Sequence, residues 1–283
     1  IGFNTTFSLS PDGSKVVYWR LKNGKRNLVV RNLISGEEKE ITQYESGNTW
    51  VPVFSPDGKY VVYAWEGGSA PYTLHTISLE TGETRCLNHN GFVSDWSKDG
   101  RYLLTFTARR FREQAYSILS VNADVSEKVD LLIPSESSGW RFSPDSKYVS
   151  YSHKGNLFLY SLDDKDVNQV TKGSNNNVQP LWSPDGKMLI FLSRWGFGPE
   201  LDLCGLPVVD GKAAGAVRII RADFGDNIEW NSLTGEGVEL YSLTGEGVLL
   251  YRQDSKGSTV FSIKIDPKTG QPTGEPVKLS DGS

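Results

Sequence analysis

The stretch "FSPDGKYVVYAW", from Phe54 to Trp65, decides the fold because four related copies of it occur elsewhere in the chain. A polar Ser-Pro-Asp-Gly turn separates two runs rich in β-branched and aromatic residues, which suit the pleated surface of a strand. Proline presets φ at the first corner, the Asp side chain can accept a hydrogen bond from the backbone two residues on, and glycine closes the short loop. Each copy therefore predicts a β-hairpin. The other copies are "LSPDGSKVVYWR" from Leu9, "WSKDGRYLLTFT" from Trp96, "FSPDSKYVSYSH" from Phe142 and "WSPDGKMLIFLS" from Trp182.

The turns recur at a nearly constant interval. Between Asp12, Asp57, Asp99, Asp145 and Asp185 the intervals are 45, 42, 46 and 40 residues. After each hairpin the chain continues with a third strand, a polar turn and a fourth strand, as in "YTLHTISLETGETRCLN" from Tyr72. A period of about 40 to 45 residues with four strands in each unit is typical of β-propeller blades.

A degenerate sixth unit runs from near Glu229 to the C-terminus. We therefore predict an all-β fold, a six-bladed β-propeller with four antiparallel strands in each blade, as a single domain over residues 1–283. A lone four-stranded sheet would leave an apolar face exposed, whereas blades packed face to face bury it. The chain should begin in the inner strand of the first blade, with no strand exchanged between the termini. The expected blades are residues 1–46, 47–89, 90–134, 135–173, 174–223 and 224–283.

The sixth unit contains a tandem duplication, "SLTGEGVELY" at 232–241 followed by "SLTGEGVLLY" at 242–251. Aligning Thr234 with Asp185 gives an interval of 49 residues, and aligning Thr244 gives 59. The first copy fits the period better as the hairpin turn. The second copy is then either an inserted hairpin strand on the same blade or an error in the sequence.

The phrase "WSPDGK", followed by an apolar strand, a third strand of the "LY" type and a closing "xxLT" strand, resembles the bacterial PD40 repeat, also called the WD40-like or TolB-like propeller repeat. The resemblance covers about Asn4 to Ser280 and five of the six units. Lys98 stands where proline is expected, Ser146 stands where glycine is expected, and the sixth turn has neither proline nor Asp. The resemblance implies a propeller that binds proteins, accompanies a peptidase domain or senses a ligand, and it favours a periplasmic or extracytoplasmic location.

Composition excludes several classes of partner. With 34 acidic and 30 basic residues the net charge is −4, without the basic excess that neutralises phosphates, so we expect no nucleic-acid binding. No apolar run approaches the roughly 20 residues that span a bilayer, so we expect no membrane insertion within this segment. The chain starts at Ile1 without Met, as a mature form or an excised segment would. We expect a monomer.

Cysteine and histidine give no sign of a metal centre. Cys86 and Cys204 fall in non-adjacent predicted blades, which predicts two buried thiols without a disulfide. The three histidines and these cysteines lack the spacing of a zinc site. We expect no metal and no cofactor.

Catalytic motifs are also missing from the sequence. It contains no G-x-S-x-G elbow, no H-E-x-x-H and no G-x-x-x-x-G-K-[ST] loop. The recurring Asp residues occupy turn positions that favour Asp for backbone reasons. The sequence therefore disfavours intrinsic enzymatic activity and leaves the question open.

Strand topology indicates where a ligand would bind. In an up-and-down sheet alternate loops lie at the same end, so the loops between second and third strands share one rim with the links between blades. This rim collects Arg, aromatic and amide side chains, which are enriched at recognition surfaces. We predict that Trp96 and Trp182 are core residues, and that Trp19 and Trp65 are either core or ligand-facing. The candidate ligand-binding residues are Trp50, Phe92, Arg109, Arg110, Arg112, Arg194, Trp195 and Phe197.

The resulting functional hypothesis is a non-catalytic binding or sensing propeller that recognises a protein or peptide partner on this rim. Arg and aromatic groups would hold an acidic or extended peptide. Two alternatives stay open. One is a carbohydrate-binding or carbohydrate-processing propeller, in which the same aromatic rings stack on a glycan. The other is the propeller portion of a larger hydrolase or of a membrane-linked sensor protein.

Overall fold

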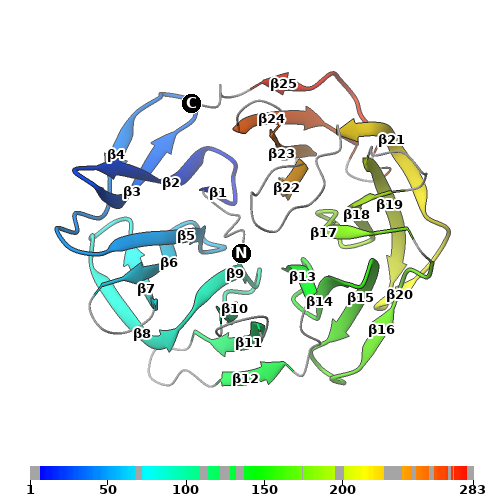
Figure 1. The fold of residues 1–283 in the computed structure, drawn as a ribbon, viewed down its shortest axis with the longest axis horizontal. Helices are drawn as coiled ribbons and strands as arrows, with labels where there is room; N and C mark the ends of the chain where they lie inside the picture. Colours follow the sequence, from blue (N-terminus) through cyan, green and yellow to red (C-terminus); the bar gives the residue numbers. More distant parts are fainter. Residues whose placement is uncertain are drawn as a thin grey trace. The chain divides into compact units, whose positions relative to one another are not determined.

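The chain divides into two compact units, Phe3–Ser135 and Glu136–Ser283 with Ile1–Gly2. Every regular element among the described residues is a β-strand, and each sheet is formed by consecutive strands (Figure 1). The computed structural model describes residues 7–67, 72–108, 114–121, 128–131, 137–173, 175–194, 201–225, 238–243, 247–254, 258–266, 269 and 271–278.

The unit Phe3–Ser135 contains three antiparallel sheets of four strands each. In each sheet the strands follow chain order, as successive hairpins produce. The first sheet has β1 (Phe7–Leu9), β2 (Lys15–Lys22), β3 (Lys25–Asn32) and β4 (Glu38–Glu40). The second has β5 (Asn48–Phe54), β6 (Tyr60–Glu66), β7 (Thr73–Ser78) and β8 (Thr84–Asn90). The third has β9 (Phe92–Trp96), β10 (Tyr102–Ala108), β11 (Gln114–Ser120) and β12 (Lys128–Leu131).

The other unit also contains three antiparallel sheets, of which the middle one gains a fifth strand because β21 pairs with β19. The fourth sheet has β13 (Ser137–Phe142), β14 (Tyr148–His153), β15 (Asn156–Ser161) and β16 (Val167–Gln169). The fifth has β17 (Val178–Trp182), β18 (Met188–Ser193), β19 (Leu201–Val209), β20 (Lys212–Ala213) and β21 (Arg218–Gly225). The sixth has β22 (Val238–Leu243), β23 (Val248–Asp254), β24 (Ser258–Lys264) and β25 (Val277–Lys278).

These six sheets confirm the predicted class, an all-β, six-bladed β-propeller. Strand β1 is the first strand of its own sheet and β25 is the last strand of another, so the described strands show no exchange between the two ends of the chain. The blade boundaries given above, and the assignment of the six blades to one domain, stay predictions.

The same Ser–Asp hydrogen bonds close all five repeat turns. In the second sheet the Ser55 hydroxyl donates to Asp57 Oδ1 at 2.6 Å and accepts the backbone N–H of Tyr60 at 2.9 Å. Asp57 Oδ1 also accepts the N–H of Lys59 at 3.0 Å, which confirms the predicted backbone role of Asp. We call this arrangement the Ser–Asp latch. The other latches are Ser10–Asp12, Ser97–Asp99, Ser143–Asp145 and Ser183–Asp185, with distances of 2.6, 2.8, 2.6 and 2.7 Å.

Position four of the turn requires left-handed backbone, as its glycines predict. Gly58 has φ +70°, and Ser146, the one exception, still adopts φ +57°. A left-handed conformation costs an L residue about 1 to 2 kcal/mol. The latch at Ser143 keeps this turn geometry although glycine is missing.

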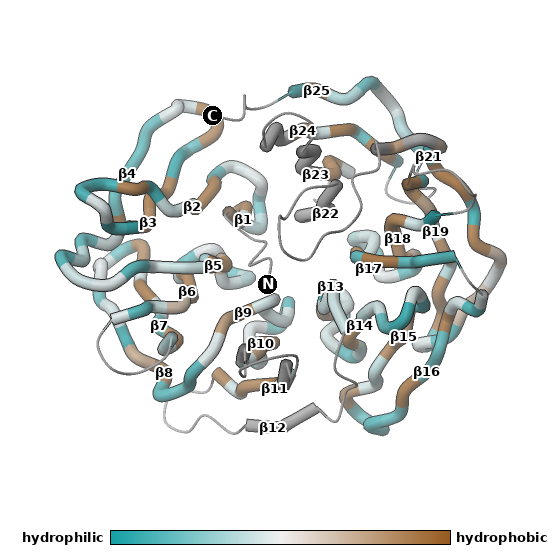
Figure 2. The backbone as a smooth tube through the Cα atoms, viewed as in Figure 1, coloured by the Kyte–Doolittle hydropathy of each residue, from teal (hydrophilic) through white to brown (hydrophobic). Residues whose placement is uncertain are grey.

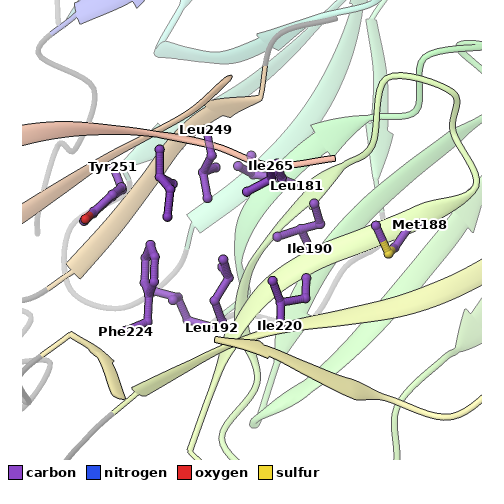
Figure 3. Packing of buried hydrophobic residues seen from close by; sticks show 11 residues of the cluster. Leu181, Met188, Ile190, Leu192, Ile220, Phe224, Leu249, Tyr251 and Ile265 are labelled. Carbon is purple, nitrogen blue, oxygen red and sulfur yellow. The ribbon is translucent and has the colours of Figure 1, made fainter. Parts of the chain in front are cut away.

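Apolar residues gather between the sheets of each unit, whereas the turns are polar (Figure 2). In the unit Glu136–Ser283 one core cluster joins the fifth and sixth sheets, with Phe224 and Leu192 facing Tyr251 (Figure 3). Trp96 and Trp182 are 7% and 8% exposed, which confirms that they are core residues.

The tandem duplication forms one ordinary hairpin, so the predicted alignment of its first copy with the turn is wrong. The first copy supplies β22 and the second supplies β23, and these strands pair antiparallel. The interval from Asp185 to the turn between β22 and β23 is long because the fifth sheet is enlarged: β19 has nine residues and β21 has eight. Within the described residues the sixth sheet has the usual four strands.

The two cysteines are both free, and only one of them is buried. Cys204 lies in the core, whereas Cys86 is exposed on β8, the outer strand of its sheet. The expectation of two buried thiols is therefore wrong for Cys86, because an edge strand leaves side chains in solvent.

Candidate functional site

Five side chains of the unit Phe3–Ser135 meet on the rim formed by loops between second and third strands. Four of them lie at or next to the rim end of a strand, and Trp19 lies in the middle of β2. Trp19 is in β2, Arg26 is at the start of β3, and Trp50 is at the start of β5. Glu66 ends β6, and Tyr72 directly precedes β7. We call these five residues the aromatic–arginine cluster.

Arg26 is held between two indole rings from neighbouring sheets. Its Cζ atom lies 4.6 Å from the ring centroid of Trp19 and 3.8 Å from that of Trp50. Both distances are within the roughly 6 Å of a cation–π interaction. The backbone is fixed too, because the Arg26 N–H donates to Asn48 Oδ1 at 3.1 Å and its carbonyl accepts the Thr49 hydroxyl at 3.0 Å.

Glu66 anchors the same cluster through its carboxylate. Glu66 Oε2 accepts the indole N–H of Trp50 at 3.2 Å and the amide of Asn48 at 3.5 Å. The phenol of Tyr72 also hydrogen-bonds Glu66, and burial together with this carboxylate raises the pKa of Tyr72. The carboxylate therefore orients Trp50 through the edge of its indole, and Arg26 lies over the face of that ring.

Aromatic rings continue from the cluster into the core. Tyr72 packs edge-on against Trp50 at a centroid distance of 6.2 Å and contacts Phe92 at 4.4 Å. Phe92 is 1% exposed and stacks on Phe106. The prediction that Phe92 faces the ligand is thus corrected: its ring supports Tyr72 from the core because β9 begins inside the apolar cluster.

Backbone strain occurs beside Trp50. The pairing of β5 with β6 shifts register between Trp50 and Val53, and Val51 has φ +48°. This conformation is a marked outlier for a β-branched residue. A bulge of this kind re-aims side chains, and here it directs Trp50 toward Arg26. The link before β5 is equally close-packed, since a Cβ on Gly47 would collide with the Glu66 carbonyl oxygen.

The remaining predicted site residues fall into two groups. Arg194 directly follows β18 in the other unit and is half-buried. Five of the candidates lie outside the described residues: Arg109, Arg110, Arg112, Trp195 and Phe197.

Three members of the cluster, Arg26, Glu66 and Tyr72, are absent from the predicted set. Arg26 and Tyr72 could have been found from topology, because each lies at the start of a third strand, on the same rim as Trp50. Trp19, left open between core and ligand, contacts Arg26 and is half-buried. Trp65 instead packs against Tyr44 and His75, with its indole nitrogen buried.

A groove of about 700 Å³ lies on the opposite rim of the same unit. Its walls come from the latches of the second and third sheets and from β7, β8 and the turn between them, and they mix carboxylates, hydroxyls, two cations and apolar groups. Tyr60 is its most exposed large hydrophobic residue, at 44%. The lining residues used below are Tyr60, Thr76, Glu80, Glu83, Lys98 and Asp99.

The part of the chain that the structure describes contains no cluster of three or more His, Cys, Asp and Glu side chains suited to a metal ion. The same residues include no long apolar helix of the kind that crosses a membrane.

Comparison with curated proteins finds relatives of different types. No protein-family model matches the chain. An uncharacterized peptidase of Bacillus subtilis is 25% identical over 191 residues, 64% of this chain and 28% of that protein. An uncharacterized protein of Agrobacterium fabrum is 31% identical over 156 residues, 50% of each chain. The Tol-Pal system protein TolB of Francisella tularensis is 25% identical over 197 residues, 66% of this chain and 45% of TolB. The chain thus spans half or less of the length of these relatives.

Solved structures share the fold over most of this chain. TolB from Acinetobacter baumannii matches with a TM-score of 0.67 at 14% identity, over 96% of this chain and 65% of TolB. Oligogalacturonate lyase in complex with manganese has a TM-score of 0.66 at 16% identity, over 94% and 74%. A prolyl endopeptidase has a TM-score of 0.62 at 16% identity, over 98% and 43%. Because one fold supports many functions, these matches show the fold alone.

The sequence similarity to TolB and the structural match to TolB agree with the repeated turn and the six sheets. The chain is therefore a TolB-like β-propeller built from PD40-type repeats.

Proposed function

We propose that the chain is a non-catalytic binding propeller that recognises a protein or peptide partner through the aromatic–arginine cluster. The observation that carries the proposal is that the guanidinium of Arg26 contacts the rings of both Trp19 and Trp50. All three residues are half-buried on this rim. Trp, Tyr and Arg are the side chains most enriched at binding hot spots. Similarity to a protein named for the Tol-Pal system supports a role in contacts with other proteins.

The cluster is suited to binding because its parts are fixed before a partner arrives. Side chains that must be ordered on binding cost about 0.5 to 1.5 kcal/mol each. Here Trp50 is fixed by Glu66 and Arg26 by two rings and two backbone hydrogen bonds. Most of that ordering cost is therefore met during folding.

The wider setting belongs to the proposal as well. The Bacillus subtilis peptidase and TolB are both longer than this chain, because the matched segments cover only 28% and 45% of them, which supports a propeller that works beside other domains. The similarity to TolB supports an extracytoplasmic location. Likeness to an uncharacterized peptidase and to a prolyl endopeptidase keeps a neighbouring hydrolase domain as an alternative, which the gene on either side of this segment would reveal.

The test is selection of binders from a displayed library of random peptides, followed by affinity measurement with the selected peptides by fluorescence anisotropy. We expect Trp50→Ala to weaken binding at least about 30-fold, the loss expected for a hot-spot side chain. Tyr60→Ala on the opposite rim is the matched control and should leave affinity unchanged. Peptides that lose affinity only with Tyr60→Ala would overturn the proposal.

A second candidate function is saccharide binding in the groove of the opposite rim. Its volume of about 700 Å³ lies within the range of small-molecule sites. Hydroxyl, carboxylate and ammonium groups there can bond sugar hydroxyls, and the exposed ring of Tyr60 offers a stacking face. The fold match to oligogalacturonate lyase makes short oligogalacturonates a sensible probe. In calorimetric titrations Tyr60→Ala should abolish their binding and Trp50→Ala should not.

A further inference from the structure

The clamped guanidinium of Arg26 has unused hydrogen-bonding capacity. Among the residues that the structure describes, it has neither an ion-pair partner nor a hydrogen-bond acceptor. The contrast with Arg20 on the neighbouring strand is clear, because Arg20 pairs with Glu38 and also bonds the Tyr18 phenol. A guanidinium carries five N–H donors, and those of Arg26 are not used by the described protein.

The nearby carboxylate of Glu66 forms no ion pair with Arg26 among the described contacts. Glu66 is engaged by the Trp50 indole, the Asn48 amide and the Tyr72 phenol instead. Trp19 and Trp50 contribute ring faces, which hold a cation without accepting its hydrogen bonds in the guanidinium plane. The cluster therefore presents a fixed, charged donor fork that no described carboxylate engages.

We infer that Arg26 is the receptor for a single carboxylate of the bound partner; this inference rests on the proposed function. The planar fork of arginine matches a carboxylate in two parallel hydrogen bonds, and its weak hydration suits a ring-lined site. Glu66 lies beside the receptor and disfavours a second negative charge close by, so the site selects one carboxylate over a polyanion. The carboxylate comes either from an acidic side chain or from the end of a chain.

The experiment uses small probes that separate these two sources. N-acetylglutamate amide carries only a side-chain carboxylate, N-acetylglycine carries only a terminal carboxylate, and N-acetylglycinamide carries none. Each is titrated into the whole chain while NMR follows the indole N–H signals of Trp19 and Trp50. We expect saturable shifts with one or both carboxylates and none with the neutral amide. The probe that shifts the signals at lower concentration identifies the source.

Substitutions test whether the carboxylate probes bind through Arg26. Arg26→Gln should abolish the saturable shifts, and Arg26→Lys should retain charge but weaken binding at least about tenfold, because lysine lacks the planar fork. Arg20→Gln removes the same charge from the paired neighbour and should change nothing. Equal responses to N-acetylglycine and its amide, or shifts that survive in Arg26→Gln, overturn the inference. Tighter binding of inorganic phosphate than of either carboxylate overturns it too.

The experiments distinguish a failure of the carboxylate inference from a failure of the proposed partner binding. Selected peptides without any carboxylate that still require Trp50 would sustain partner binding at this rim and refute the carboxylate receptor. Peptides that ignore Trp50 would refute both.

Discussion

The imidazole of His75 stacks on the ring of Tyr63, its cross-strand neighbour, at a centroid distance of 5.8 Å and an interplanar angle of 25°. Two other sheets place a ring pair at the matching positions of their second and third strands. His75 therefore occupies a packing position that an aromatic ring fills elsewhere. The matching pairs are Tyr151–Phe158 and Tyr251–Phe261.

The substitution His75→Phe should make stability less dependent on pH. Burial lowers the pKa of His75 below its ordinary value of 6.5, so the unfolded chain binds this proton more readily than the folded chain. Stability then falls as pH drops below about 6.5. The variant loses this contribution, which urea unfolding at pH 8, 6.5 and 5 would show as a shallower decline. The values at pH 8, where histidines are neutral in both states, serve as the internal reference. An unchanged decline would contradict the assignment.

Gly47→Ala should destabilise the protein much more than Gly82→Ala. Both glycines have left-handed backbone, with φ +81° and +74°, so both variants carry a conformational cost of about 1 to 2 kcal/mol. A Cβ at Gly47 would also collide with the backbone of Glu66, whereas one at Gly82 meets nothing within 4 Å. We expect the collision to add about 1 to 3 kcal/mol in urea unfolding. Equal losses in the two variants would show that the link before β5 can relax.

Asp57→Ala should lower stability by about 1 to 2 kcal/mol without weakening partner binding at the aromatic–arginine cluster. The substitution removes the acceptor of the Ser55 hydroxyl and of the Lys59 N–H. Asp163→Ala, in an exposed turn, is the control and should have little effect. Thermal melting and peptide affinity separate the two properties. A stable variant that no longer binds would assign Asp57 to the binding site.

Acid should open the first latch within a defined pH window. Hydrogen bonds from the Ser10 hydroxyl and from Ser14 hold the pKa of Asp12 at about 2, below its ordinary value of 3.8. Its stabilising contribution is therefore complete above about pH 4 and is lost as pH falls through 2. Asp12→Asn should melt at a lower temperature than wild type at pH 5, and the difference should narrow toward pH 2. Ser10→Ala should show a smaller change of the same sign. A constant difference across this range would refute the account.

Local chemistry made the fold predictable. Each hairpin turn is closed by hydrogen bonds within one short segment, such as residues 10–15 or 55–60. Each copy of the motif therefore predicts its own hairpin without reference to the rest of the chain. The tandem at 232–251 was misaligned because its register depends on the length of the fifth sheet, which no local pattern reports. The site was only partly predictable for a similar reason. Trp50 belongs to an identifiable rim, but its contact with Arg26 joins two sheets and arises from packing.

The Ser–Asp latch also has a consequence for folding kinetics. Its hydrogen bonds join residues at most five positions apart, so closing it needs no contact with the rest of the chain. Hairpins form in about 1 to 10 μs, and chains rich in local contacts fold faster than those that rely on distant pairings. The five latches therefore give the chain five separate nucleation points, so that no single turn has to start the folding of the whole protein.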